Sequence, residues 1–171
     1  MDLRALIRDI PDFPKPGVVF LDITPLLGDA RGFRDAIDTM AERLKDCGAT
    51  KIVCAEARGF IFGAALAYKM GLGFVPVRKP GKLPYKTTSV TYDLEYGTDT
   101  LEMHVDALSP GEKVLLIDDV LATGGTVKGM LQLLDTLGAD VVCVGVLIEL
   151  EFLHGREKLK GFRVESFIKV N

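Results

Sequence analysis

A chain of 171 residues can bury one complete hydrophobic core and is too short for two ordinary domains, so we expect a single domain over residues 1–171. Hydrophobic residues make up 48% and charged residues 26%, which is typical of a folded globular protein and excludes a disordered one. The net charge of −3 argues against a protein that coats nucleic acid or binds an anionic membrane.

The first half of the chain predicts three helices and two strands around a proline-rich loop. Apolar spacing indicates a short opening helix over 3–10 that ends at Pro11. The segment after it contains three prolines and a glycine, and we expect a loop there. The elements expected next are a helix over 33–44, a strand at 51–55, a helix over 60–70 and a strand at 74–77.

The second half begins with a segment rich in Gly, Pro, Thr, Ser and Tyr, residues 78–97, which predicts a mobile flap. Alternating apolar residues at 101–105 indicate a half-exposed strand at or near a sheet edge. Strands alternate with helices along the whole chain, so we expect an α/β fold with a mostly parallel sheet. The remaining expected elements are strands at 114–118, 141–148 and 162–170 and helices over 126–137 and near 152–159.

Targeting and metal-binding patterns are missing from the sequence. The first ten residues carry four charged side chains, and the longest apolar run, 141–148, is far too short to span a membrane. The three cysteines form no CxxC pair, and the two histidines lie far apart. We therefore expect a cytoplasmic protein with reduced thiols and without a zinc site.

The most informative segment is VLLIDDVLATGGT, residues 114–126. An apolar strand carries two adjacent carboxylates, Asp118 and Asp119, to the edge where parallel sheets bind ligands. The turn 122–126 then leads into a helix, so backbone N–H groups, the helix N-terminus and two threonine hydroxyls can converge on one anion. The carboxylates can accept hydrogen bonds from a polyol and help to hold Mg²⁺ through water.

The alternative for this segment is a solvated turn whose aspartates merely cap a helix. Neither the GxxxxGK[ST] loop of nucleoside triphosphatases nor a GxGxxG fingerprint after a strand occurs. The order of strand, acidic pair, TGGT and helix favours the anion site, and it resembles the motif with which type I phosphoribosyltransferases bind phosphoribosyl pyrophosphate (PRPP).

The resemblance implies the fold of that family, a central mostly parallel sheet flanked by helices, with a flexible flap over the site, here about 78–105. It also implies that Asp118 and Asp119 contact the ribose hydroxyls. The residues that would bind the 5-phosphate are Ala122, Thr123, Gly124, Gly125 and Thr126.

Further segments resemble the adenine phosphoribosyltransferases of this family. They are PDFPKPGVVFLDIT (11–24), EARGF (56–60), RKPGKLP (78–84) and LEYG (94–97), and with the PRPP motif they cover most of the chain in family order. The resemblance implies a purine-salvage glycosyltransferase, a pentosyltransferase, that converts adenine and PRPP into AMP and pyrophosphate with Mg²⁺. The metal would be bound mainly through PRPP, with a contact through water to Asp119.

For adenine, the resemblance implies packing against Phe20 and readout of the ring edge by the backbone of Val19 and Leu21. Many relatives carry Arg or Lys where this chain has Leu21, so a side-chain contribution there is lost. An aromatic face and backbone donors and acceptors suit a purine. Without the resemblance, 18–20 would read as a small plug of the core.

Four cations are implied at the pyrophosphate site: Arg58, Arg78, Lys79 and Lys82. Arg58 would also lie near the base. Clustered cations suit a highly charged leaving group, and the alternative is a solvated basic turn. Because some of these side chains act across a dimer interface in relatives, the resemblance implies a homodimer.

Proton transfer to or from the purine would fall to Glu95 of LEYG, since relatives use that glutamate. Enclosure of the site would strip water from the carboxylate and raise its pKa toward the working range. In 6-oxopurine phosphoribosyltransferases an aspartate stands directly before the TGxT loop, whereas this chain has Ala122. That difference favours a 6-aminopurine as the substrate.

Three rival functions remain open on the sequence alone. One is a xanthine, guanine or hypoxanthine phosphoribosyltransferase, which Ala122 and LEYG disfavour. Another is a PRPP- or purine-sensing transcription regulator, which would need a DNA-binding module or a basic face. The third is an inactive scaffold, against which the number of intact motifs argues.

Overall fold

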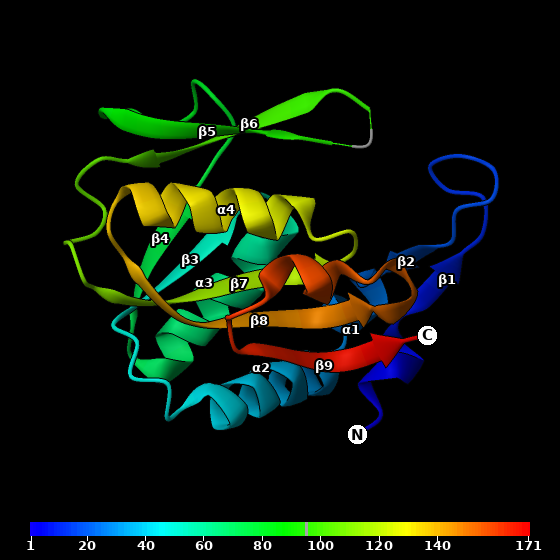
Figure 1. Cartoon of the computed structure of the whole chain (residues 1–171). Coiled ribbons are helices and arrows are strands. Elements are labelled where there is room, and N and C mark those ends of the chain that lie inside the picture. The colour runs from blue at the N-terminus through cyan, green and yellow to red at the C-terminus, as the bar shows by residue number, and fades with distance from the viewer. Residues whose placement is uncertain (95) are drawn as a thin grey trace.

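The computed structural model describes residues 1–94 and 96–171, so Glu95 lies outside the described residues. Its centre is a five-stranded sheet in which every neighbouring pair is parallel. Figure 1 shows this sheet between layers of helices. From one edge to the other, the strands are β4 (Gly73–Val77), β3 (Lys51–Ala55), β7 (Lys113–Leu121), β8 (Asp140–Leu150) and β9 (Val164–Val170).

The strand order fixes where a ligand can bind. From β3 the chain first steps outward to β4, then returns past β3 to β7 and continues to β8 and β9. The direction of winding therefore reverses between the neighbours β3 and β7. In open α/β sheets, a crevice forms at the carboxyl ends of the two strands that flank such a reversal.

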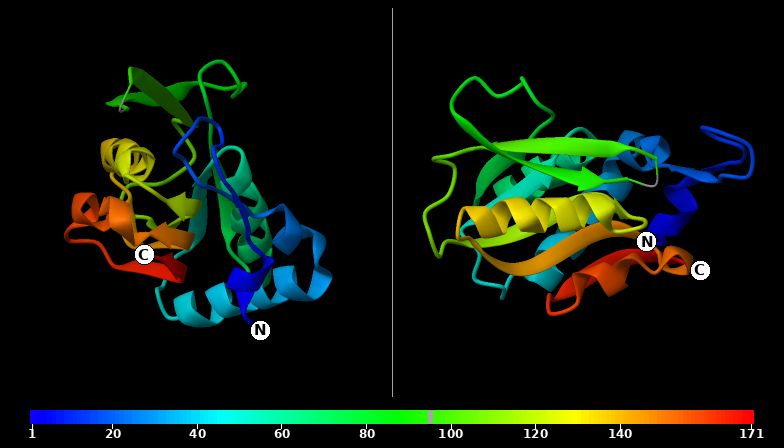
Figure 2. Two further views of the ribbon diagram at one scale, coloured as in Figure 1. Left: turned by 90° about the vertical axis from the view of Figure 1, so that its right-hand side faces the viewer. Right: turned by 45° about the horizontal axis from the view of Figure 1, so that its top comes forward.

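Helices cover both faces of the sheet and produce two hydrophobic cores. α2 (Ala30–Leu44) and α3 (Arg58–Met70) pack on one face, and α4 (Gly125–Thr136) packs on the other (Figures 1 and 2). Because side chains alternate along a strand, Ile52 and Cys54 of β3 join the first core while Val53 and Ala55 join the second. These helices and strands confirm the α/β prediction and agree with the predicted ranges to within a few residues.

The opening prediction is wrong beyond Leu6. A short 3-10 helix, η1 (Leu3–Leu6), begins after Asp2, whose carboxylate accepts a hydrogen bond from the backbone N–H of Arg4. β1 (Arg8–Ile10) then pairs antiparallel with β2 (Phe20–Asp22). Pairing with this later strand outweighs the local helical spacing, and no short-range pattern reports it. α1 (Thr24–Gly28) follows directly.

The segment expected to be a flap contains an antiparallel hairpin, β5 (Thr87–Asp93) and β6 (Thr98–His104). The sequence does not predict β5, because its Thr- and Ser-rich composition looks like a loop. The prediction of a strand at or near a sheet edge is confirmed for β6, although the sheet is a separate two-stranded one. β6 pairs with β5 and touches the end of β4 only through a bridge between Arg78 and Glu102.

The hairpin lies on the outer side of α4, away from the central sheet (Figure 1). Leu101 and Met103 are fully buried in the second core, while the residues that alternate with them are less buried, so the predicted half-exposed strand is confirmed. Tyr92 of β5 packs its ring against Gly129 of α4, where a Cβ atom would lie 2.8 Å from the ring. The absence of a side chain at this helical position therefore lets the hairpin approach α4 closely.

The helix predicted near 152–159 is divided into two 3-10 turns, η2 (Glu151–Leu153) and η3 (Gly155–Leu159). Between them, His154 adopts a left-handed backbone conformation with φ 53°. A left-handed residue interrupts a right-handed helix, and spacing alone does not reveal it. After this break, Gly155 lies against the backbone of Ala122 and Gly124, just before α4.

The expectation of reduced thiols agrees with the structure. Cys47, Cys54 and Cys143 are free thiols, and burial raises the pKa of Cys54 well above its usual range and that of Cys143 to about 11. Thiols held neutral in this way are poor nucleophiles. Within residues 1–94 and 96–171, no helix has the length and apolar character needed to cross a membrane.

Candidate active site

A cavity of about 470 Å³ opens at the carboxyl ends of β3 and β7, where the strand order reverses. Segments far apart in the sequence line it. They are 18–21 around β2, 55–59 after β3, 118–127 from β7 into α4, and Leu150 and Leu153. The folding of the chain thus brings together the acidic pair, the TGGT loop, Arg58 and the predicted adenine segment.

The TGGT loop presents backbone N–H groups to the cavity. Gly124 has φ 86° and precedes α4, a conformation that suits glycine. In the part of the chain that the structure describes, no side chain caps the N-terminus of this 12-residue helix. Its first N–H groups therefore remain available to an anion, together with the positive end of the helix dipole.

The acidic pair is buried at the bottom of the cavity. Asp118 and Asp119 are 9% and 6% exposed, and Asp118 Oδ1 accepts a hydrogen bond of 2.8 Å from the backbone N–H of Asp119. Burial and the neighbouring charge of Asp119 raise the pKa of Asp118 well above its usual range. Two crowded carboxylates are unfavourable without a ligand, which is typical of binding sites.

Arg58 links the acidic pair to the aromatic wall. Its Nε lies 2.8 Å from Asp119 Oδ2, and its guanidinium lies 5.2 Å from the ring centroid of Phe20. The contact with Asp119 is an ion pair without hydrogen-bond geometry, so the buried Oδ2 accepts no hydrogen bond from the described residues. The ion pair therefore leaves lone pairs of Asp119 unused.

The predicted adenine segment divides between the cavity and the core. Phe20 is half-buried and packs edge-on against Phe13, with ring centroids 5.2 Å apart. Val19 is 56% exposed. Leu21 alternates with Phe20 along β2 and is buried in the first core, so its side chain points away from the opening. Only its backbone can contribute to recognition of a base.

The other three predicted cations gather around a residue whose role the sequence did not reveal, Glu56. Its carboxylate accepts hydrogen bonds from Arg78 Nη2 at 2.8 Å and from Lys82 Nζ at 3.1 Å. It also accepts one from the backbone N–H of Lys79, whose ammonium pairs with Asp99. Among the described residues that line the cavity, Glu56 is present but these three cations are not. The three cations therefore contact Glu56 from outside the cavity lining.

Glu56 should make the free energy of unfolding depend on pH. Burial alone would raise its pKa, but the hydrogen bonds from Lys79, Arg78 and Lys82 outweigh burial and lower it to about 2. A lowered pKa stabilises the folded state above the ordinary pKa, and this stabilisation is lost as pH falls through about 4.5 toward 2.

We therefore expect Glu56→Gln to lower the free energy of unfolding at pH 7 by about 1–2 kcal/mol, since the exposed cations are screened by solvent. The difference from wild type should shrink as pH falls toward 2. Urea unfolding at several pH values measures it, with Glu42→Gln, which removes an exposed carboxylate of α2, as the control. A constant deficit at all pH values would contradict the assignment.

The donor set fits a Mg²⁺ ion that arrives with its ligand. Over residues 1–94 and 96–171, no group of three or more His, Cys, Asp or Glu side chains could hold a metal. Asp119 Oδ2, buried and without a hydrogen bond from the described residues, can accept one from a metal-bound water. A carboxylate with free lone pairs beside an anion loop suits a metal that is held mainly by phosphate oxygens.

Two apolar residues of the cavity, Leu150 and Leu153, carried no signal in the sequence. Leu150 ends an apolar strand and looks like core, while Leu153 belongs to the η2 turn. Gly155 was also missed, although it packs directly beneath the TGGT loop. Only the spatial approach of the C-terminal segment to β7 reveals these three residues.

Comparison with known proteins agrees with this geometry. The family model of the phosphoribosyl transferase domain matches residues 27–167. The adenine phosphoribosyltransferase of Solidesulfovibrio magneticus is 71% identical over 170 residues, which cover 99% of each chain. The chain belongs to the adenine phosphoribosyltransferase family. This membership confirms the resemblance that the motifs indicated.

Solved structures of the family have the same fold. The adenine phosphoribosyltransferase of Thermoanaerobacter pseudethanolicus superposes with a TM-score of 0.96 at 51% identity, covering 99% of this chain and 98% of that one. The enzyme of Giardia lamblia, solved with 9-deazaadenine, gives 0.93 at 40% identity, covering 99% and 97%. The predicted type I phosphoribosyltransferase fold is therefore confirmed.

Proposed function

We propose that this chain transfers the phosphoribosyl group of PRPP to adenine, forming AMP and pyrophosphate in purine salvage. The observation that carries the proposal is one cavity in which an anion loop, an acidic pair and an aromatic wall converge. Those three surfaces match the phosphate, the ribose and the base of the product. Membership of the adenine phosphoribosyltransferase family supports the choice of base.

The PRPP end of the site would work mainly through the backbone. N–H groups of 122–126 at the start of α4 would bind the 5-phosphate, and the hydroxyls of Thr123 and Thr126 would add hydrogen bonds. Asp118 and Asp119 would accept hydrogen bonds from the ribose hydroxyls. The buried position of both carboxylates supports this role, because a neutral polyol satisfies them without adding charge.

The base end would combine stacking with readout by the backbone. Adenine would pack against Phe20, with the backbone of Val19 and Leu21 reading its edge and Arg58 beside it. The burial of the Leu21 side chain supports backbone readout at that position. The guanidinium of Arg58, 5.2 Å from the centroid of the Phe20 ring, supports a place for Arg58 beside the base.

The leaving pyrophosphate would be stabilised by Arg58, Arg78, Lys79 and Lys82. Three of these cations are balanced by Glu56 and Asp99. A pyrophosphate would compete with those carboxylates for the same hydrogen-bond donors. Charge would thus be stabilised as the bond between C1 and oxygen breaks and the sugar becomes oxocarbenium-like.

Mg²⁺, bound through PRPP and through water to Asp119, would neutralise charge on the pyrophosphate. Glu95 would accept or donate the proton of the purine ring. Asp93, two residues before it, has its carbonyl oxygen 3.8 Å from the place that a Cβ atom on Gly125 would occupy. The 78–105 flap would close over the site and exclude water from the cationic sugar. By analogy with its relatives, the enzyme would act as a homodimer.

The test measures pyrophosphate release from Mg²⁺ and PRPP with adenine, hypoxanthine, guanine or xanthine supplied separately. We expect turnover with adenine alone. Turnover with a 6-oxopurine would overturn the interpretation of Ala122 and LEYG. No turnover with any of the four bases, together with PRPP binding measured by calorimetry, would favour a PRPP-sensing regulator.

A further inference from the structure

The TGGT loop rests on a second backbone segment, the start of η3. A Cβ atom on Gly155 would lie 2.3 Å from the carbonyl oxygen of Ala122 and 3.1 Å from the backbone N of Gly124. A Cβ atom on Gly124 would in turn lie 2.7 Å from the carbonyl oxygen of Gly155. The two segments therefore pack backbone against backbone, and Gly155 is buried.

The residue after Gly155 is tied to the edge of the central sheet by a fork of hydrogen bonds. Arg156 donates from Nε to Glu149 Oε1 at 2.9 Å and from Nη2 to Glu149 Oε2 at 2.6 Å. Its Nη1 donates to the carbonyl oxygen of Val164 at 2.9 Å. A bidentate pair fixes direction as well as distance, so the position of η3 relative to β8 and β9 is defined.

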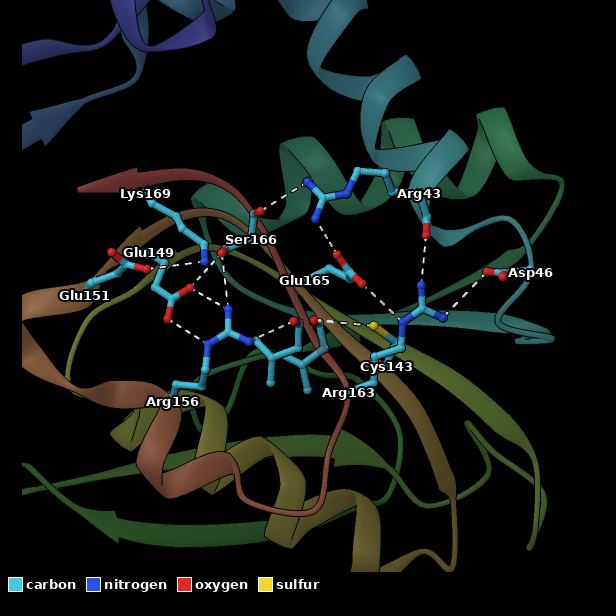
Figure 3. Close-up of polar contacts among 12 residues, drawn as sticks. Arg43, Asp46, Cys143, Glu149, Glu151, Arg156, Arg163, Glu165, Ser166 and Lys169 are labelled. Carbon is cyan, nitrogen blue, oxygen red and sulfur yellow. Dashed lines mark hydrogen bonds and ion pairs between the residues drawn. The ribbon is translucent and has the colours of Figure 1, made fainter. Parts of the chain in front are cut away.

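Glu149 is buried and is held by a second hydrogen-bond donor. Its side chain is 5% exposed, and Ser166 of β9 donates a hydrogen bond of 2.6 Å to its Oε2. The hydrogen bonds from Arg156 hold the pKa of Glu149 below its usual range, so the carboxylate stays charged. Figure 3 shows these three side chains converging from β8, η3 and β9.

We propose that Arg156, held by Glu149 and Ser166, is a positioning residue for PRPP: it holds Gly155 against residues 122–124 and so fixes the loop that binds the 5-phosphate. This inference rests on the proposed function. Arg156 contacts no atom that would react. It acts through Gly155 on the backbone N–H groups of the loop, whose direction determines phosphate affinity.

A matched control lies near the start of β9. Arg163 is 41% exposed, against 42% for Arg156, and it too pairs with carboxylates, those of Asp46 and Glu165. It also donates to a backbone carbonyl oxygen, that of Arg43. Figure 3 shows this second cluster beside the first, linked to it by a hydrogen bond from Arg43 to the carbonyl oxygen of Ser166. Both arginines bind carboxylates and one backbone carbonyl oxygen, although Glu149 is more buried than Asp46 and Glu165. Only Arg156 directly follows the glycine that packs against the loop.

The experiment compares Arg156→Met, Arg156→Lys and Arg163→Met by steady-state kinetics and by calorimetry with PRPP. We expect Arg156→Met to raise both KM and Kd for PRPP about tenfold or more, with kcat and KM for adenine within about twofold of wild type. Arg156→Lys should recover part of the loss. Arg163→Met should leave all of these values within about twofold, even where it lowers the melting temperature.

Two results would overturn the proposal: an unchanged Kd for PRPP in Arg156→Met, or an equal rise in Arg163→Met. If Arg156→Met fails to fold, Gly155→Ala decides, because it keeps the ion pair but places a methyl group against Ala122. A wild-type Kd for PRPP in that variant would also refute the inference. If wild type formed no AMP, the proposed function would fail, and PRPP calorimetry would still test the role of Arg156.

Discussion

Glu95→Gln is expected to slow the formation of AMP by roughly 10²–10⁴-fold, because the amide can neither accept nor deliver the proton of the purine ring. The loss should appear in kcat, with KM for PRPP little changed, since the proposed phosphate and ribose contacts do not involve this residue. Single-turnover measurement of AMP, with enzyme in excess over PRPP, isolates the chemical step.

The matched control for this variant is Asp93→Asn. It removes an exposed carboxylate two residues earlier in the chain, so it reproduces the change of charge without removing the proposed proton carrier. We expect it to retain at least about half of the wild-type rate, as surface substitutions usually do. A near-normal rate for Glu95→Gln would refute its role, and an equal loss in Asp93→Asn would point to hairpin charge instead.

Asp118→Asn and Asp119→Asn should each weaken PRPP binding by about 10–100-fold, the loss expected for a hydrogen bond to a charged group. An amide keeps one acceptor oxygen but loses the negative charge that strengthens its bonds to the ribose hydroxyls. In Asp119→Asn the ion pair with Arg58 is lost as well. Calorimetry with PRPP and Mg²⁺ measures the effect, with Asp140→Asn at the start of β8 as the control.

These two variants should remain folded without ligand. The buried carboxylates of Asp118 and Asp119 repel each other, so removing one charge is expected to leave the melting temperature unchanged or to raise it. Weaker binding combined with equal or greater stability identifies residues kept for a ligand. An unchanged affinity for PRPP would refute the ribose role, and a large fall in melting temperature would show that the pair is structural.

The sequence predicts best those elements whose signals are local. The local pattern of residues located α2, α3 and β3: helical spacing of apolar residues for α2, a glycine stop after α3 and a short apolar run for β3. It failed at β1, which exists only because β2 returns beside it, and at β5, whose Thr-rich residues gain a partner in β6. Pairing between segments is decided by tertiary structure, which a single-sequence pattern does not contain.

The same division holds within the site. The acidic pair and the TGGT loop are contiguous, so their order along the chain was informative. Glu56 lies within EARGF, but its function as the partner of Arg78 and Lys82 required the structure. The support of the loop by Gly155 was equally invisible, because all of α4 and β8 separate it from Gly124 in the chain. A separation of that length leaves no periodic trace that connects the two segments.

The contact between Gly124 and Gly155 also limits how this enzyme can vary. A Cβ atom at either position would meet backbone of the other segment, so no larger residue at one site can be accommodated by a smaller residue at its partner. Gly124 is restricted further by its φ of 86°. Paired substitutions, in which one residue becomes larger as its neighbour becomes smaller, therefore cannot occur at these two positions. Sequence variation around the phosphate loop is confined to positions whose side chains point away from this backbone contact.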